Sequence, residues 1–140
     1  MTDNLESELK FINYTVNDLV YKINYNFDEQ DVEVDFSIKR KIDFLDDEKN
    51  KMLVHLTVSV FEDAEENNYP FSLTIDITGV FELKNVDDEV ERKKYAEVNA
   101  VAILFPYIRS LISTITANVN IPPLILPPIN IVKLIENEEE

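Results

Sequence analysis

Between residues 19 and 84 the chain alternates apolar and polar side chains with a period of two, in four separate stretches. In the clearest stretch Phe36 and Ile38 alternate with Ser37 and Lys39. Because successive side chains of a β-strand point to opposite faces, this pattern is typical of strands with one buried and one solvated face. It predicts strands over residues 19–27, 32–44, 52–60 and 71–83.

The connections between these predicted strands are short and polar, and they comprise residues 28–31, 45–50 and 63–70. Such lengths suit antiparallel strands that are neighbours in sequence, whereas a parallel crossover needs about a dozen residues. Gly79, the only glycine, lies inside the fourth stretch. A glycine within a strand indicates a β-bulge or a close approach of another backbone.

Residues 99–135 form the most apolar part of the chain. Their first half repeats apolar residues at helical spacing, although Pro106 requires either a kink or a helix that begins close to it. Four prolines then predict a stiff extended segment over residues 120–129, here called the strap. Asn130 is a suitable N-cap for a short final helix over residues 131–135.

Together these elements predict an α+β fold and a single domain over residues 1–140. Its core is a four-stranded antiparallel sheet. A long helix from the C-terminal half of the chain and the short final helix pack on one face of that sheet.

Composition excludes several classes of function. The net charge of −15 disfavours binding to nucleic acid and anionic lipid. With no cysteine, one histidine and one glycine, the chain lacks the residues of familiar zinc sites, phosphate loops and dinucleotide sites. His55 falls on a polar strand face, where we expect an ordinary exposed histidine. We therefore expect no catalytic residue, no metal and no cofactor.

Nothing in the sequence indicates a membrane protein. The first ten residues are acidic and unlike a signal peptide, and no apolar run reaches the roughly 20 residues of a spanning helix. We expect a cytoplasmic protein without membrane insertion.

Two separated sequence motifs in the apolar region indicate a known family. ILFPYIR at residues 103–109 is followed by Ile121, Pro122, Leu124, Leu126, Pro128, Ile129 and Asn130 at fixed spacing. This combination resembles the SecB family of protein-export chaperones, whose corresponding motifs read roughly LLFPYAR and FPxLxLAPVN. Gly79, Val80 and Phe81 also resemble the GIF-type element of that family.

The resemblance implies an ATP-independent holdase that binds unfolded preproteins and passes them to the SecA motor. It also implies a homotetramer, a dimer of dimers packed through the long helices. We place the oligomer interface on four residues of the long helix: Ile103, Ile108, Leu111 and Ile115.

The groove for clients is expected along the strap and the exposed sides of the helices. A strap held by prolines cannot form regular strand pairing, so its side chains stay available for contact. The client-binding residues we expect are Tyr107, Ile121, Leu124, Leu126 and Ile131.

The chain also departs from the family pattern. Pro127 replaces the usual alanine, Pro123 stiffens the strap further, and the end of the chain is short for a contact with SecA through a C-terminal tail. An acidic sheet face could serve SecA instead. Three alternatives remain open: a SecB-like chaperone dedicated to an antitoxin, a non-catalytic adaptor with one fixed partner, and a small-molecule binder that uses a cavity between sheet and helix.

Overall fold

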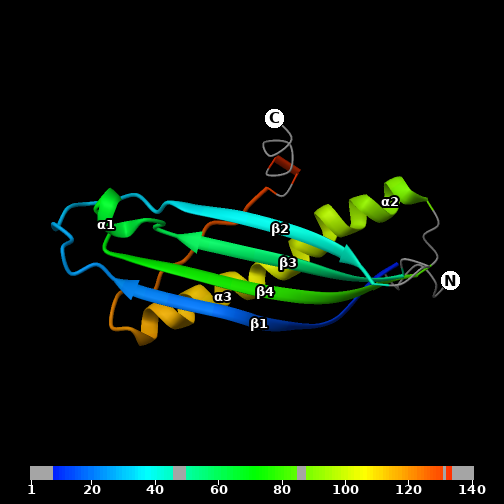
Figure 1. Cartoon of the computed structure of the whole chain (residues 1–140), viewed down its shortest axis with the longest axis horizontal. Helices are drawn as coiled ribbons and strands as arrows, with labels where there is room; N and C mark the ends of the chain where they lie inside the picture. The colour runs from blue at the N-terminus through cyan, green and yellow to red at the C-terminus, as the bar shows by residue number, and fades with distance from the viewer. Residues whose placement is uncertain (1–7, 46–49, 85–87, 131, 134–140) are drawn as a thin grey trace.

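The computed structural model describes residues 8–45, 50–84, 88–130 and 132–133. Four strands form one antiparallel sheet: β1 (Leu9–Ile23), β2 (Phe36–Phe44), β3 (Lys51–Val60) and β4 (Phe71–Leu83). A short helix, α1 (Ala64–Asn67), precedes β4, and α2 (Glu89–Lys94), the π-helical turn Tyr95–Asn99 and α3 (Ala100–Asn118) form one continuous helix. Figure 1 shows this helix crossing one face of the sheet obliquely. The predicted α+β class and antiparallel four-stranded sheet are confirmed.

The order of the strands is β1-β4-β3-β2, which corrects one expectation. Hairpins join β2 to β3 and β3 to β4, but β1 and β2 lie at opposite edges of the sheet. The connection between them runs from residue 24 to residue 35, long enough to pass around the end of the sheet.

The predicted first strand is wrong at both ends. β1 starts ten residues earlier, at Leu9, and ends at Ile23, so Tyr25 and Phe27 belong to the connection. Register shifts between Phe11 and Asn13 and between Val16 and Asp18 interrupt the alternation that would have revealed its first half. The predicted second strand is also too long, because its residues before Phe36 belong to the same connection.

Gly79 marks the place where the helix touches the sheet. A Cβ atom added to Gly79 would lie 2.6 Å and 2.8 Å from the two Cδ atoms of Leu104 on α3. Leu104 and its helical neighbours Val101 and Ile108 are fully buried in this contact layer. The close approach at Gly79 is thus made by a side chain and not by another backbone as expected, and only a residue without a side chain leaves room for Leu104.

The long helix does not begin near Pro106, which lies in the interior of α3. A π-helical turn, Tyr95–Asn99, lies about two to three turns upstream of Pro106 within the same continuous helix. At that turn the hydroxyl of Tyr95 donates a hydrogen bond of 2.9 Å to Glu8, just before β1. This bond is the main reason that the pKa of Tyr95 lies above its ordinary 10.0, with burial adding to it.

Side chains of α3 hold the strap in place. Asn120, with φ of 68°, ends the helix in the left-handed region. Arg109 Nε then donates to the Leu126 carbonyl at 3.0 Å, and Ser113 Oγ donates to the Leu124 carbonyl at 2.9 Å. The Leu124 amide donates to Thr116 Oγ1 at 2.8 Å. These bonds satisfy backbone groups that have no strand or helix partner, so the strap keeps one position.

The strap has an inner and an outer side. Leu126 is fully buried, whereas Ile125 is 73% exposed. Beyond the strap, Asn130 Oδ1 accepts the Lys133 amide at 3.1 Å, so the predicted N-cap is confirmed. Residues 132–133 are helical, and the rest of the expected final helix lies outside the described residues.

We expect Gly79→Ala to lower the free energy of unfolding by about 1 to 3 kcal/mol, because the new methyl group overpacks the site. Urea denaturation measures this change. Leu104→Ala removes the nearer of the two obstructing side chains, the other being Phe81, so the double variant should cost less than the sum of the single variants. Additive costs would contradict a direct contact between Gly79 and Leu104.

The strap provides a matched pair of variants. Leu126→Ser should lower the free energy of unfolding by about 2 to 5 kcal/mol, because it removes a buried aliphatic side chain and buries a hydroxyl. Ile125→Ser should stay within about 0.5 kcal/mol of the parent, since that side chain is exposed. Equal costs in urea denaturation would show that the strap has no fixed inner side.

Candidate functional site

The expected client-binding residues fall into different environments. Tyr107 is 38% exposed, and Ile121 and Leu124 are half-buried against the core. Leu126 is part of the core of the single chain and offers no surface. Ile131 lies outside the described residues. Ile125, which alternates with the inward residues of the strap, is the exposed residue that the sequence analysis missed.

The expected interface residues on α3 are also mixed. Ile108 is fully buried against the sheet, and Ile103, Leu111 and Ile115 are half-buried beside it. The side of α3 that faces away from the sheet carries small exposed residues: Ala102, Pro106, Ser110, Thr114 and Ala117. A second helix could approach this side closely, because no large side chain stands in the way.

An aromatic cluster joins the long helix to the edge strand β1. The ring of Tyr107 lies 4.7 Å from that of Tyr14 and 5.5 Å from that of Phe11, and Phe11 in turn lies 5.3 Å from Phe81. Such tilted aromatic pairs stabilise the contact beyond the area they bury. Tyr107, the tyrosine of the LFPY motif, thus anchors α3 to β1 while its side chain remains partly exposed to solvent.

Next to this cluster the helix-facing side of β1 is poorly covered. Val16, Leu19 and Ile23 share that side, by their pairing with buried residues of β4, yet they are 40%, 38% and 48% exposed. We call these three residues the β1 band. Its exposure follows from the geometry, since α3 packs mainly on the central strands and β1 lies at the edge. Val16 escaped the sequence analysis because the neighbouring register shifts hide its alternation.

The opposite face of the sheet is polar but not acidic, which corrects the expected acidic face. The charged residues on its four strands are Asp18, Asp43, Asp76, Glu82, Lys10, Lys22, Lys39, Lys41 and Lys51. Acids and bases therefore nearly balance there. Pairing of Lys51 and Lys10 with the same residue of β4, Glu82, shows how closely the two signs are mixed.

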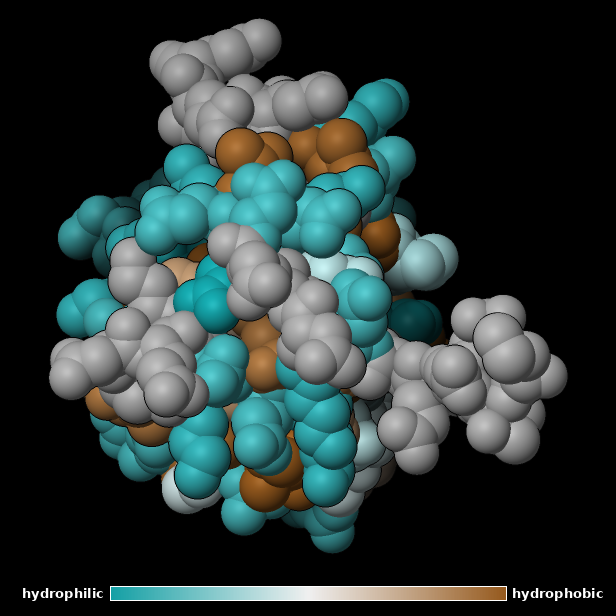
Figure 2. Space-filling view, turned by 90° about the vertical axis from the view of Figure 1, so that its right-hand side faces the viewer, coloured by the Kyte–Doolittle hydropathy of each residue, from teal (hydrophilic) through white to brown (hydrophobic). Residues whose placement is uncertain are grey.

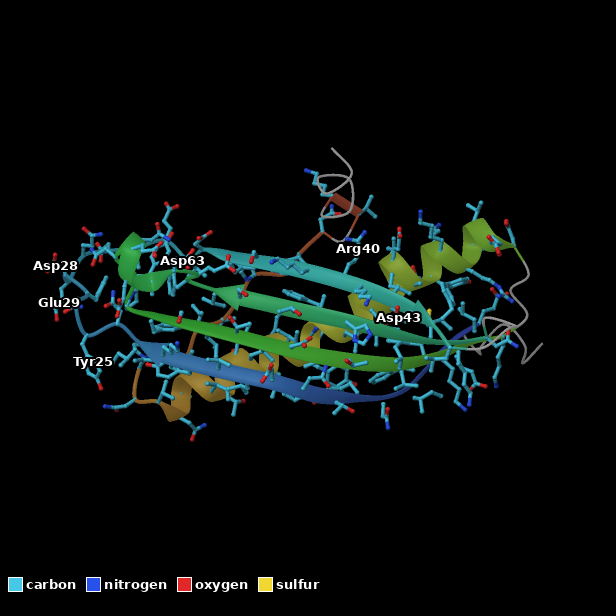
Figure 3. All side chains as sticks on the ribbon, viewed as in Figure 1. Tyr25, Asp28, Glu29, Arg40, Asp43 and Asp63 are labelled. Carbon is cyan, nitrogen blue, oxygen red and sulfur yellow. The ribbon has the colours of Figure 1, made fainter. Side chains whose placement is uncertain are left out.

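Much of the described negative charge lies at one end of the sheet. The connection 24–35 and the segment 61–68 together carry nine acids and no lysine or arginine. Figure 3 shows Asp28, Glu29 and Asp63 at this end, together with Tyr25, which is 89% exposed. Buried Asn24 holds the two segments together, donating to the carbonyls of Ala64 and Tyr69 at 3.2 Å and 2.9 Å.

His55 is not the plain exposed histidine that we expected. Its Nε2 lies 3.0 Å from Asp43 Oδ2 and its Nδ1 lies 2.9 Å from Thr78 Oγ1, which also accepts a 2.7 Å hydrogen bond from Asn17 Nδ2. These four residues come from β3, β2, β4 and β1 and link all the strands across the polar face. The arrangement ties the sheet together on its polar face. It lines neither the hollow between the end of β2 and α2 nor the hollow between the end of β1 and α1.

Within the described ranges no three His, Asp or Glu side chains gather closely enough to hold a metal ion. The helix Glu89–Asn118 is long and apolar enough to cross a membrane. A core helix passes the same test, and here the apolar side of α3 is buried against the sheet.

Comparison with known proteins identifies the fold and the family. The model of the family described as "Preprotein translocase subunit SecB" matches residues 14–140. An uncharacterized protein of Methanocaldococcus jannaschii is 38% identical over 135 residues, which cover 94% of this chain and 85% of that protein. The protein-export protein SecB of Nitrosomonas europaea is 33% identical over 99 residues, covering 70% of this chain and 60% of that protein.

A solved structure has the same fold at low sequence identity. The SecB-like chaperone of Mycobacterium tuberculosis, in complex with a ChAD peptide from the HigA1 antitoxin, superposes with a TM-score of 0.67 at 15% identity, covering 91% of this chain and 92% of that chain. SecB proteins are soluble, non-catalytic chaperones that bind unfolded client polypeptides. Because the family model matches residues 14–140, this chain belongs to the SecB family of protein-export chaperones.

Proposed function

We propose that this protein is an ATP-independent cytoplasmic holdase that keeps preproteins unfolded before their export by the SecA motor. Family membership supports the general role. The observation that carries the proposal for this chain is the β1 band: three aliphatic side chains left in contact with solvent beside a partly exposed tyrosine, in a chain with net charge −15.

Holding an unfolded chain requires apolar contact without a chemical step. Each aliphatic side chain that becomes fully buried contributes about 1.5 to 3 kcal/mol. Several partly exposed residues, namely the β1 band with Tyr107 and Ile125, together supply weak binding without sequence preference. The negative charge keeps such a surface from self-association and attracts cationic clients.

A cationic segment of SecA would find little attraction on the sheet face, where acids and bases nearly balance. The end of the sheet formed by residues 24–35 and 61–68 is the more suitable partner, since it carries acids only. We therefore assign any electrostatic contact with SecA to that end.

The proposed assembly is a homotetramer, a dimer of dimers that packs through the long helices. The exposed side of α3 suits this role because its small residues permit close helix packing. Ile103, Leu111 and Ile115, half-buried in the single chain, would lose their remaining exposure in such an interface.

Light scattering should give a mass about four times the 16.3 kDa of one chain. Ser110→Arg places a long charged side chain on the outer side of α3 and should lower that mass. Ser37→Arg, on the exposed polar face of β2, should leave the mass unchanged. A monomeric parent, or equal behaviour of the two variants, would contradict assembly through the helices.

The holdase proposal is tested by suppression of aggregation of several unrelated denatured proteins. The parent should suppress aggregation without ATP and equally well with a chelator. Val16→Ser with Leu19→Ser, and separately Ile125→Ser, should weaken suppression several-fold by removing apolar contact area. His55→Ala, on the opposite face of the sheet, should leave it intact.

Other results would favour the alternatives. Tight binding of one protein, with no effect on unrelated unfolded chains, would indicate an adaptor, or an antitoxin-dedicated chaperone where that protein is an antitoxin. Loss of the tetramer in the β1 band variant would assign the band to a subunit interface. An apolar small molecule that copurifies would indicate a small-molecule binder.

A further inference from the structure

β2 is an edge strand, and within the described ranges its backbone pairs with β3 alone. The Leu45 amide donates to the Lys51 carbonyl at 2.9 Å, directly beyond the last paired residues of the two strands. Because bonded and non-bonded positions alternate in an antiparallel ladder, the odd-numbered residues of β2 bond to β3. The amides and carbonyls of Ile42 and Phe44 therefore point away from β3, toward the edge of the sheet.

A hollow of about 270 Å³ lies beside this part of the edge. Ile42 and Phe44 form one wall, and the first turns of the long helix, residues 89–97, form the other. Phe44 is 37% exposed, and Figure 2, which views the molecule from this end, shows hydrophobic residues between hydrophilic ones. The helix wall carries two glutamates, one arginine and one lysine, and Lys93 Nζ lies 3.9 Å from Glu97 Oε1, so its charges offset one another. The hollow therefore suits uncharged apolar side chains.

A strand added beside β2 would extend the sheet over the first turns of the long helix. Neighbouring strands lie about 4.8 Å apart, and Figure 1 shows the helix passing beyond the β2 edge at α2. Because side chains alternate between the two faces, one set would enter the hollow and the other would lie on the polar face beside Lys39 and Lys41. Opposite charges on neighbouring strands stabilise their pairing, so acidic residues are favoured in the second set.

We propose that the edge at Ile42 and Phe44 binds an extended client segment as a fifth strand. Its apolar residues fill the hollow and alternate with polar residues, acidic beside Lys39 and Lys41. Backbone hydrogen bonds supply affinity that tolerates many sequences, and the hollow supplies the preference for alternation. The site lies at the opposite edge of the sheet from the β1 band. That the strand comes from a client rests on the proposed holdase function.

Amide hydrogen exchange, followed by NMR in the full-length protein, measures the pairing directly. The probe is a capped seven-residue peptide in which valine alternates with glutamate. In the free protein the Ile42 and Phe44 amides should exchange faster than those of Lys41 and Asp43, which face β3. Saturating peptide should slow exchange at Ile42 and Phe44 about tenfold or more.

N-methylation of alternate peptide amides is the matched control, because it removes donors and leaves the side chains in place. Methylation of the amides that face β2 should weaken binding about tenfold, and methylation of the other set should have less than about a twofold effect. Loss at the valine amides would indicate an antiparallel fifth strand, and loss at the glutamate amides a parallel one.

Ile42→Pro removes an edge donor and keeps an apolar side chain, at a position where the ladder to β3 needs no amide. It should weaken peptide binding at least about threefold more than Ile42→Ala, which keeps the amide and removes more apolar area. Circular dichroism checks that both variants are folded. The opposite order of the two variants would show that apolar contact alone holds the peptide, and would overturn the proposal.

Unchanged exchange at Ile42 and Phe44 with the peptide bound, or equal effects of the two methylated peptides, would also overturn it. Protection that rises with protein concentration in the absence of peptide would assign the edge to a second copy of the chain, with the same consequence. Suppression of aggregation is measured separately. A parent that suppresses aggregation without this protection keeps the holdase role and loses the site, whereas protection without suppression refutes the holdase role and leaves the strand site.

Discussion

The contact between Leu104 and the backbone at Gly79 determines how the long helix lies on the sheet. With no Cβ at Gly79, the helix approaches β4 closely at that one place, and its direction is then set by the buried residues on either side, Val101 and Ile108. A single helix placed over the central strands leaves the edge strands partly uncovered. The β1 band on one side and the hollow beside β2 on the other are both consequences of this arrangement.

The strap completes the cover of the sheet. It also explains why the two motifs that resemble the SecB family, ILFPYIR and the proline-rich segment after it, occur together. Arg109, the last residue of ILFPYIR, donates to the Leu126 carbonyl, and Leu126 belongs to the proline-rich motif. Prolines remove amides that would otherwise need partners, and α3 side chains bond the amide and carbonyl of Leu124 and the carbonyl of Leu126. The two motifs therefore form the two sides of one contact.

The alternation of residues was sufficient to predict the antiparallel sheet and the faces of β3 and β4. It failed where the backbone departs from regular geometry. The register shifts in β1 hid its first half, and the apolar residues Val32 and Val34 extended the second predicted strand into a connection. Strand order was also missed, because it depends on the pairing of β1 with β4, residues more than fifty positions apart.

The candidate site was predicted less well than the fold, for a physical reason. On a proline-held segment the sequence shows which residues are apolar but not which of them face inward, so Leu126 was expected at the surface and Ile125 was overlooked. The difference between these neighbours is fixed by the bonds from Arg109 and Ser113, which are tertiary contacts. Those bonds orient Leu126 into the core and Ile125 toward solvent. The proposed client surface is therefore specified by the polar contacts behind the strap as much as by its own apolar residues.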